Sequence, residues 1–244
     1  MGAPRAKTGT TGKTATIYYG GFLHKTGGAF HHARMLEREL SRRGWTVRII
    51  TLDDLPVWCR YLPHLAEKAV NRVRRPFGFL TKGQVTRALY KHFFDRPSDL
   101  RVFEDIYISW DSDEPSITLL HAAWSDNLQA FEISGDRERR FRRREAKVLN
   151  QLEQPVVTVS VPYKDFLVNE HLAEGLAKAI DVIELGIDQR KYEDPVEVER
   201  RAKSIIYTGT LEARKNPRFL LQVFEEVHRQ DPDFRLTIVG DGPM

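Results

Sequence analysis

The feature that most constrains the fold of this chain is a regular alternation of short apolar runs with longer helical patterns. Residues 15–19 (ATIYY) are β-branched and aromatic, which predicts a strand. From Ala29 to Arg43 apolar residues repeat at helical spacing, and Gly44 ends the pattern. Residues 45–52 (WTVRIITL) supply a second strand. These segments predict a βαβ unit with parallel strands and a right-handed connection.

The alternation continues as far as residue 185. The remaining elements are expected as two helices around a turn at 76–78 within 62–94, strands at 102–110 and 117–121, a helix at 137–152, a strand at 155–161, a helix at 163–177 and a strand at 180–185. This order is typical of an α/β domain with a Rossmann-like, doubly wound parallel sheet, expected here over residues 15–185. Residues 1–14 are polar and aperiodic, which predicts a disordered leader.

A second unit is expected after a polar linker at 186–201. Residues 204–208 predict a strand, a helix is expected from Asn216 or Pro217 to about Gln230, and residues 234–239 predict another strand. Two strands and one helix cannot enclose a hydrophobic core of their own. Residues 202–244 therefore read as the beginning of a second Rossmann-like domain that is incomplete.

The composition of the chain indicates the cellular compartment in which the protein is expected. The sequence has no apolar run near the roughly 18 residues that a membrane-spanning helix needs, and residues 1–21 lack an apolar signal core. The single cysteine, Cys59, cannot form an internal disulfide and is expected to be a buried spectator. A cytoplasmic protein is expected.

The glycine-rich loop that follows the first strand is the first candidate for ligand binding. Ligands of open α/β sheets bind beyond the carboxyl ends of the strands, where glycines let phosphates approach backbone amides. The stretch from Gly20 to Gly28 is too long for the dinucleotide fingerprint Gly-x-Gly-x-x-Gly, although Asp53 and Asp54 stand near the acidic position of that motif. A nucleotide-dependent oxidoreductase or epimerase therefore remains an alternative.

Four segments together resemble one family of enzymes. They are Gly-Gly-Ala-Phe-His-His at 27–32, VTVS at 157–160, IELGID at 183–188, and the pair IYTGTLEARK at 206–215 and IVGDGP at 238–243. In this order and spacing they resemble glycosyltransferase family 4. The resemblance spans most of the chain outside residues 1–14 and 53–100.

The resemblance implies a GT-B fold, in which two Rossmann domains face a cleft. It implies transfer of a sugar from a nucleotide-diphosphate sugar to a glycan or lipid-linked acceptor, with retention of configuration and with no metal or other cofactor. The first domain would supply the acceptor side, and the second would supply most of the donor site.

The resemblance also assigns roles to residues. Gly27, Gly28, Gly209, Arg214 and Lys215 would lie at the donor diphosphate, where Lys215 would neutralise the charge that grows on the leaving group. His121, at the end of the run ITLLH, would be the catalytic histidine beside the transferred sugar, with a hydrogen-bonded structural histidine as the alternative. His32 and His31 are candidates for the acceptor side, with ordinary helix-packing or surface histidines as the alternative.

Two departures from the family pattern matter. Thr210 stands where the family usually has an arginine, although Arg214 could supply a second cation. The family's paired glutamates, which hold the donor sugar and ribose, would lie beyond Met244. We therefore expect weak transferase activity from residues 1–244 alone, and a non-catalytic module that binds an acceptor or a membrane is the alternative.

Basic residues gather in two stretches. In residues 68–91 they alternate with aromatic and aliphatic side chains, which favours peripheral contact with the anionic inner face of a membrane. A solvated helix face is the alternative. Residues 137–147 (RERRFRRREAK) mix arginines with acidic residues, which favours an exposed helix with internal ion pairs over nucleic-acid binding. Asp111-Ser112-Asp113 matches the metal-binding Asp-x-Asp element of other glycosyltransferases and remains a minor alternative.

Overall fold

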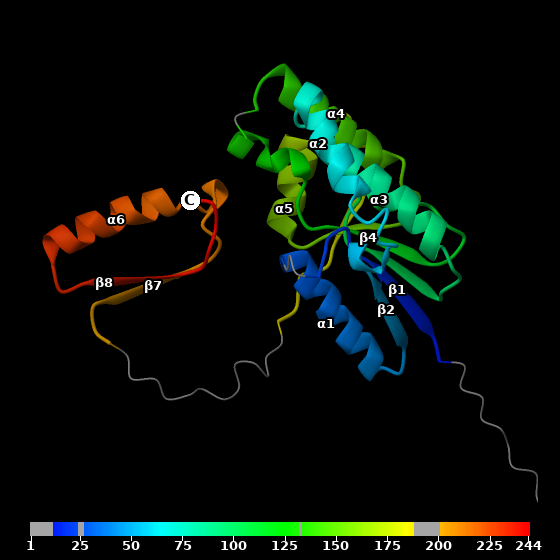
Figure 1. The fold of residues 1–244 in the computed structure, drawn as a ribbon, viewed down its shortest axis with the longest axis horizontal. Helices are drawn as coiled ribbons and strands as arrows, with labels where there is room; N and C mark the ends of the chain where they lie inside the picture. Colours follow the sequence, from blue (N-terminus) through cyan, green and yellow to red (C-terminus); the bar gives the residue numbers. More distant parts are fainter. Residues whose placement is uncertain (1–11, 24–26, 132, 188–200) are drawn as a thin grey trace, which may run out of the picture. The chain divides into compact units, whose positions relative to one another are not determined.

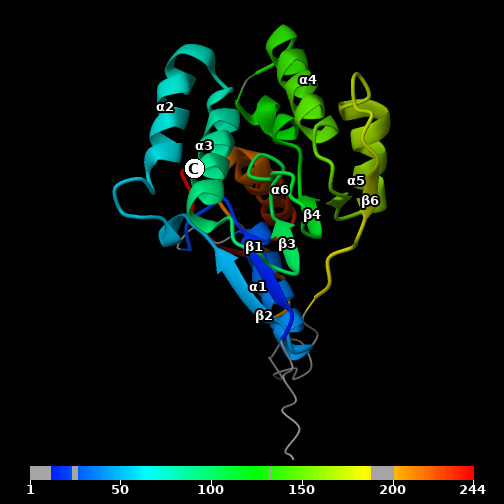
Figure 2. The same ribbon diagram turned by 90° about the vertical axis from the view of Figure 1, so that its right-hand side faces the viewer.

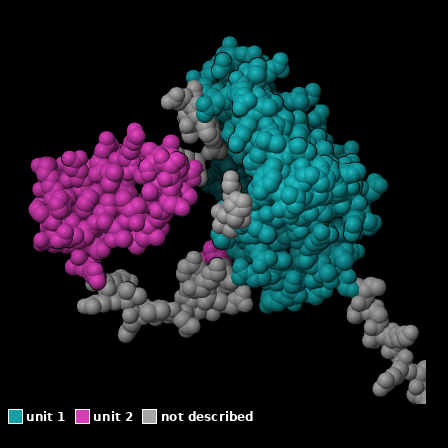
Figure 3. Space-filling model, viewed as in Figure 1, with its two compact units in different colours: residues 1–128, 133–186 teal, residues 129–132, 187–244 magenta. Residues whose placement is uncertain are grey.

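The structure is a computed structural model that describes residues 12–23, 27–131, 133–187 and 201–244. Its residues group into two compact units, 1–128 with 133–186, and 129–132 with 187–244 (Figure 3). Most of the expected leader (1–11) and linker (188–200) lies outside the described residues.

A six-stranded sheet forms the centre of the first unit, and every neighbouring pair of its strands is parallel. Its order is β2-β1-β3-β4-β5-β6. The strands are β1 (Thr14–Tyr18), β2 (Thr46–Ile50), β3 (Leu100–Phe103), β4 (Ser116–Leu120), β5 (Val156–Thr158) and β6 (Ile180–Val182). The predicted α/β class with a Rossmann-like parallel sheet is confirmed.

Helices cover both faces of this sheet (Figures 1 and 2). They are α1 (Gly28–Arg42), α2 (Leu62–Arg74), α3 (Gly78–Phe94), α4 (Asp136–Asn150) and α5 (Val161–Phe166), with short helical turns η1 (Leu52–Asp54), η2 (Trp124–Phe131) and η3 (Leu167–His171). The chain moves from β1 to β2 in one direction and from β3 to β6 in the other. Because crossovers are right-handed, α1 lies on the opposite face from α3, α4 and α5.

The strand residues alternate between the two faces, as burial on both sides requires. Ile17 and Val102 pack with Ala33 and Leu36 of α1. Their neighbours Tyr18 and Phe103 point the other way and pack against Tyr90 of α3, while Leu120 and Val156 contact Phe141 and Leu149 of α4. The helical spacing seen in the sequence thus supplies the apolar face of each covering helix.

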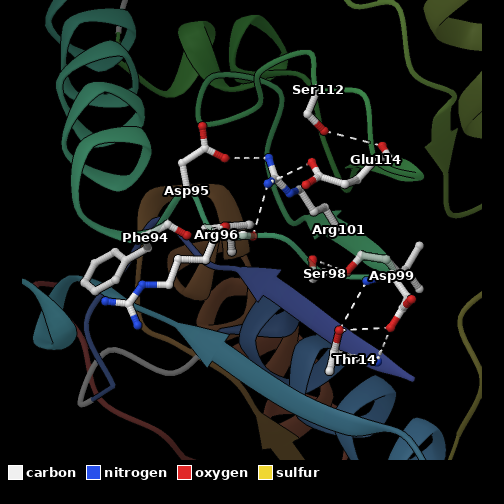
Figure 4. Close-up of polar contacts among 11 residues, drawn as sticks. Thr14, Phe94, Asp95, Arg96, Ser98, Asp99, Arg101, Ser112 and Glu114 are labelled. Atoms are coloured by element: carbon white, nitrogen blue, oxygen red, sulfur yellow. Dashed lines mark hydrogen bonds and ion pairs between the residues drawn. The ribbon is translucent and has the colours of Figure 1, made fainter. Parts of the chain in front are cut away.

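A buried arginine ties together the loops at the amino-terminal end of the sheet (Figure 4). Arg101 is 2% exposed, and its guanidinium forms ion pairs with Asp95 at 2.7 Å and Glu114 at 2.8 Å. It also donates a hydrogen bond of 3.1 Å to the carbonyl of Arg96. Beside it, the backbone amide of Thr14 donates to the carboxylate of Asp99 over 2.7 Å. These contacts fix the entries to β1, β3 and β4.

The strand predicted at 102–110 is wrong for all but its first two residues, because β3 ends at Phe103. Asp105 redirects the chain: its carboxylate accepts from the amide of Tyr107 over 2.8 Å, and its carbonyl accepts from the hydroxyl of Ser109 over 2.8 Å. Ile106 and Tyr107 are buried by packing with α3 and α4, without pairing in the sheet. The apolar run reflects burial of a loop.

Three further elements are shorter than expected. The strands predicted at 155–161 and 180–185 are three residues each, and the helix predicted at 163–177 is only six residues long. That helix begins at Val161, where the hydroxyl of Ser160 accepts from the amide of Tyr163. It then widens into the π turn η3, which ends at His171, and Gly175 takes a positive φ of 105° four residues later.

The second unit contains the expected βαβ arrangement. Its elements are β7 (Ser204–Thr208), the turn η5 (Ala213–Lys215), α6 (Pro217–Gln230) and β8 (Arg235–Val239). The two strands pair in parallel over five residues. In the part of the chain that the structure describes, no helix is both long and apolar enough to traverse a bilayer.

Candidate functional site at the carboxyl end of the sheet

The direction in which the chain adds strands to the sheet reverses between β1 and β3. The connections from these adjacent strands lead to opposite faces of the sheet, and such a switch point is where open α/β sheets bind ligands. The β1–α1 loop, the residues just after β3 and those just after β4 therefore form the first place to look for a site.

Helix α1 follows β1 at this switch point. Its N-cap is Gly27, no side chain caps it, and its first turn contains no acidic residue. No described atom lies within 4 Å of the position that a Cβ would take at Gly27 or Gly28. The first amides of a helix have no partner within the helix, and its N-terminus carries a partial positive charge. The helix start thus offers backbone donors to an anion.

Three side chains meet beside this helix start. The ring nitrogen Nδ1 of His32, on α1, lies 3.0 and 3.1 Å from the two carboxylate oxygens of Glu104, which follows β3. Nε2 of His121, which follows β4, lies 2.7 Å from Oε2 of the same carboxylate. The two imidazole rings meet edge to face with centroids 5.3 Å apart. An ionised carboxylate only accepts, so each imidazole presents an N–H to Glu104.

Burial differs sharply within this cluster. The side chain of Glu104 is fully buried, whereas each histidine side chain is 19% exposed. Burial raises the pKa of the neighbouring Asp105 carboxyl, which accepts from the indole N–H of Trp124 over 3.2 Å. Burial also raises the pKa of Tyr19, and the negative charge of Glu104 adds to that shift. The carboxyl groups of Glu104 and Asp105, which are adjacent in the sequence, thus lie in a region of low polarity.

A second buried carboxylate, Glu145 on α4, is surrounded by donors. The hydroxyl of Tyr107 donates to it over 2.6 Å, the amide of Trp124 over 2.7 Å, and both the amide and the hydroxyl of Ser125 also donate. The hydroxyl of Ser125 lies 2.6 Å from Nε2 of His171. A catalytic triad needs the histidine between nucleophile and acid, whereas here Ser125 lies between the other two. Glu145 holds the chain after β4 in place.

The second unit carries the predicted cation, Lys215, just before α6. Asn216 caps this helix in a left-handed conformation, and its side-chain oxygen accepts from the amide of Phe219 over 3.3 Å. Lys215 is exposed and has no ion pair with any described carboxylate. Gly209 has a φ of +157°, and its amide donates to the carbonyl of Val239 over 3.0 Å. Lysine and helix start here combine two sources of positive charge.

The structure brings some predicted site residues together. His32 and His121, 89 positions apart in the sequence, share Glu104, and Gly27 and Gly28 begin the helix that carries His32. His31 is exposed and takes no part in the cluster. The other predicted residues, Gly209, Arg214 and Lys215, belong to the second unit.

Sequence reasoning missed Glu104. An acidic residue directly after a buried parallel strand is the signal that could have found it, but the strand predicted at 102–110 placed it in mid-strand.

The other sequence alternatives have structural partners. The carboxylate of Asp53 accepts from the amide of Leu23 over 2.7 Å, and that of Asp54 accepts from the amide and hydroxyl of Thr51. Asp111, of the Asp-x-Asp element, accepts from the amide of Glu153 over 2.9 Å. Cys59 is buried, and its thiol donates to the carbonyl of Pro56. Each contact gives these residues a role in holding a loop.

The basic stretch at 68–91 forms part of a groove among α2, α3 and α4. The groove has a volume of about 1010 Å³, and its lining includes Val70, Phe77, Leu80, Arg74, Arg140 and Arg144. An apolar floor is thus bordered by arginines from two helices. In α4 the expected internal ion pairs occur, between Arg139 and Asp136 and between Arg142 and Glu138.

In comparisons with known proteins, no family model matches the chain and no curated protein is significantly similar to it. The resemblance to glycosyltransferase family 4 therefore rests on the four segments themselves.

Proposed function

We propose that this chain belongs to a metal-independent glycosyltransferase of the GT-B type. It would transfer a sugar from a nucleotide-diphosphate sugar to a glycan or lipid-linked acceptor with retention of configuration. The observation that carries the proposal is the convergence of His32, Glu104 and His121 at the switch point, beside a helix that begins with two glycines.

The glycine start of α1 suits a diphosphate. Neither its neighbours nor a positive φ explains why glycine occupies these positions, since Gly27 is extended and the space beside both residues is open. A ligand that packs against the backbone would explain it, because only glycine lets phosphate oxygens reach the first amides of the helix.

Lys215 is the second support for the proposal. A departing nucleoside diphosphate gains negative charge, and fixed cations that need no rearrangement stabilise that charge most effectively. Lys215 stands directly before the N-terminus of α6, so its ammonium group and the helix amides would act on the same anion.

In this proposal His121 lies beside the transferred sugar, and Glu104 orients it. The hydrogen bond of 2.7 Å to a buried carboxylate fixes which ring nitrogen carries the proton and holds the ring in place. His32 donates to the same carboxylate, so an acceptor hydroxyl could approach both histidines at one place.

Isothermal titration of the full chain with UDP, GDP and their common sugars tests the donor site. We expect Lys215→Ala to weaken binding of the preferred nucleotide by about 10- to 100-fold, the effect of losing one charge-assisted hydrogen bond. Arg229→Ala is the matched control, because Arg229 is at the other end of α6 and pairs with Glu226. Equal affinity in Lys215→Ala and the control would overturn the assignment of Lys215, and no binding of any nucleotide would contradict the proposal.

We also propose an anionic membrane surface as a partner. Trp58, Leu65 and Val73 are 74%, 59% and 83% exposed, and Val73 lines the groove together with arginines of α2 and α4. Apolar side chains beside cations suit the interface of an anionic bilayer. The chain should co-sediment with phosphatidylglycerol vesicles and not with phosphatidylcholine vesicles, and Trp58→Ser with Leu65→Ser should reduce the bound fraction. Equal sedimentation with both vesicles would refute this partner.

A further inference from the structure

The cluster of His32, Glu104 and His121 has the composition of a metal site. Two imidazole nitrogens and one carboxylate oxygen from these residues all lie within 4.8 Å of one another. Two histidines and one carboxylate are a common ligand set for Zn²⁺ and for other divalent first-row transition metals. Residues that merely pack need no such combination.

The distances fit an ion at the centre of the cluster. Ligand bonds of about 2.0–2.2 Å in tetrahedral geometry separate the ligand atoms by about 3.4 Å. The nitrogens of His32 and His121 lie 3.0 and 2.7 Å from their nearest oxygens of Glu104. An ion would need these two distances to lengthen by about 0.4–0.7 Å.

The supports of the three ligands are rigid. Glu104 and His121 directly follow adjacent parallel strands, and the amide of Glu104 donates to the carbonyl of Tyr18 over 3.0 Å. His32 lies in the second turn of α1, which packs on the same strands through Ala33. Sites built on regular elements hold their geometry better than sites on loops.

The local charge favours a cation. Glu104 is buried, Asp105 beside it is half-buried, and Lys82 is itself paired with Glu67 at 3.7 Å. With both imidazoles neutral, two carboxylates would share this region of low polarity. A divalent ion would offset both, which is how buried charge is normally accommodated.

The site is also accessible. Each histidine side chain is 19% exposed, so an ion has a path from solvent. Three protein ligands leave at least one coordination position open for water or an anion, as in catalytic sites and unlike closed structural sites.

We propose that His32, Glu104 and His121 bind one divalent transition-metal ion, with Zn²⁺ the first to test. This inference concerns the same three residues as the proposed function but not the transfer reaction, and it differs from the sequence-based expectation of no metal. At each histidine the nitrogen that faces Glu104 would give its lone pair to the ion, and the proton of the neutral imidazole would move to the other ring nitrogen. The ion would also occupy Nε2 of His121, and excess Zn²⁺ should therefore inhibit the proposed transferase.

The test is titration of the chelator-treated full chain with Zn²⁺ against a chromophoric competitor, together with the visible absorption of the Co²⁺ form. We expect one ion per chain at this site. His32→Ala and His121→Ala should each weaken binding at least about 100-fold, the upper range for loss of even a supporting partner of a metal ligand. His31→Ala is the matched control, because it removes an exposed histidine adjacent to the cluster.

Thermal melting identifies variants that fail to fold, and Glu104→Gln adds a ligand change that keeps the shape of the side chain. Two results would overturn the proposal. One is a wild-type chain that binds no ion at micromolar concentrations, and the other is an affinity in both histidine variants equal to that of His31→Ala.

Discussion

The two ends of the central sheet each bury one charged side chain, but they surround it differently. At the amino-terminal end, Arg101 is neutralised by Asp95 and Glu114. At the carboxyl end, fully buried Glu104 has two partly exposed histidines as partners. Histidine titrates near neutrality and is a common metal ligand. The carboxylates around Arg101 are less suited to either role on their own.

This difference separates structural from functional burial of charge. The contacts of Arg101 join the loop after α3 to the loop before β4, so we expect their effect to be on stability. The partners of Glu104 are accessible, exchangeable and placed at the switch point. Substitutions at the first end should therefore change folding, and substitutions at the second should change binding.

The largest effect is expected for Arg101→Met. The variant removes two ion pairs from a side chain that is 2% exposed and leaves Asp95 and Glu114 without their cation, which should cost about 3 kcal/mol of unfolding free energy. Denaturant unfolding measures this cost, and Arg96→Ala, an exposed neighbour, should cost less than about 0.5 kcal/mol. A loss of nucleotide or zinc affinity in a folded Arg101→Met chain would contradict the distinction between the structural and the functional end of the sheet.

Alkaline pH should destabilise the fold through Tyr18, the last residue of β1, on whose hydroxyl the charges of Arg101, Asp95 and Glu114 act. Burial raises the pKa of Tyr18 from 10.0 to about 12, with Asp95 and Glu114 adding to the shift and Arg101 opposing it. The folded chain thus holds the phenol proton more tightly than the unfolded chain. This contribution to stability is complete below pH 10 and is lost as pH rises toward 12.

Comparison with Tyr18→Phe isolates this contribution. Near neutral pH the wild type should be more stable, because the hydroxyl of Tyr18 donates to the carbonyl of Phe94 over 3.0 Å. Between pH 10 and 12 the wild type should lose about 2 kcal/mol relative to the variant. A difference in unfolding free energy that stays constant over this range would show that Tyr18 titrates normally.

Gly28→Ala should have the smallest effect on folding. Gly28 is the first residue of α1 and has no described atom near its Cβ position, so alanine should stabilise the helix by about 0.5 kcal/mol. Nucleotide affinity should nevertheless fall about tenfold, because the methyl group would occupy space that the diphosphate needs. Unchanged affinity, with the expected rise in melting temperature, would remove Gly28 from the donor site.

The sequence predicted most of the fold because most of its signals are local. Helical periodicity identified α1, α3 and α6 to within about two residues, and the βαβ order predicted the parallel sheet. It failed at residues 104–110, where apolar side chains are buried by distant helices and the turn depends on the contacts of a single residue, Asp105. A loop that is buried by tertiary packing can show the same apolar run as a buried strand, so the sequence pattern does not separate the two.

The site was only partly predictable for a related reason. His121 and His32 were predicted because the family resemblance has histidines after a strand and in a helix that begins with glycines. Glu104 could not be linked to them, because its contacts join residues 72 and 17 positions away and arise only when the sheet forms. The strand order of the sheet brings these three residues together, and the sequence pattern does not reveal that order directly.

Amide chemical-shift mapping of the isotopically labelled chain during titration with UDP or GDP tests the central claim most directly, because it reports which end of the sheet meets the ligand. The account predicts that the changes in the first unit concentrate at Gly27, Gly28, Glu104 and His121. Changes centred on Thr14 and Arg101, or no changes in the first unit with either nucleotide, would contradict it.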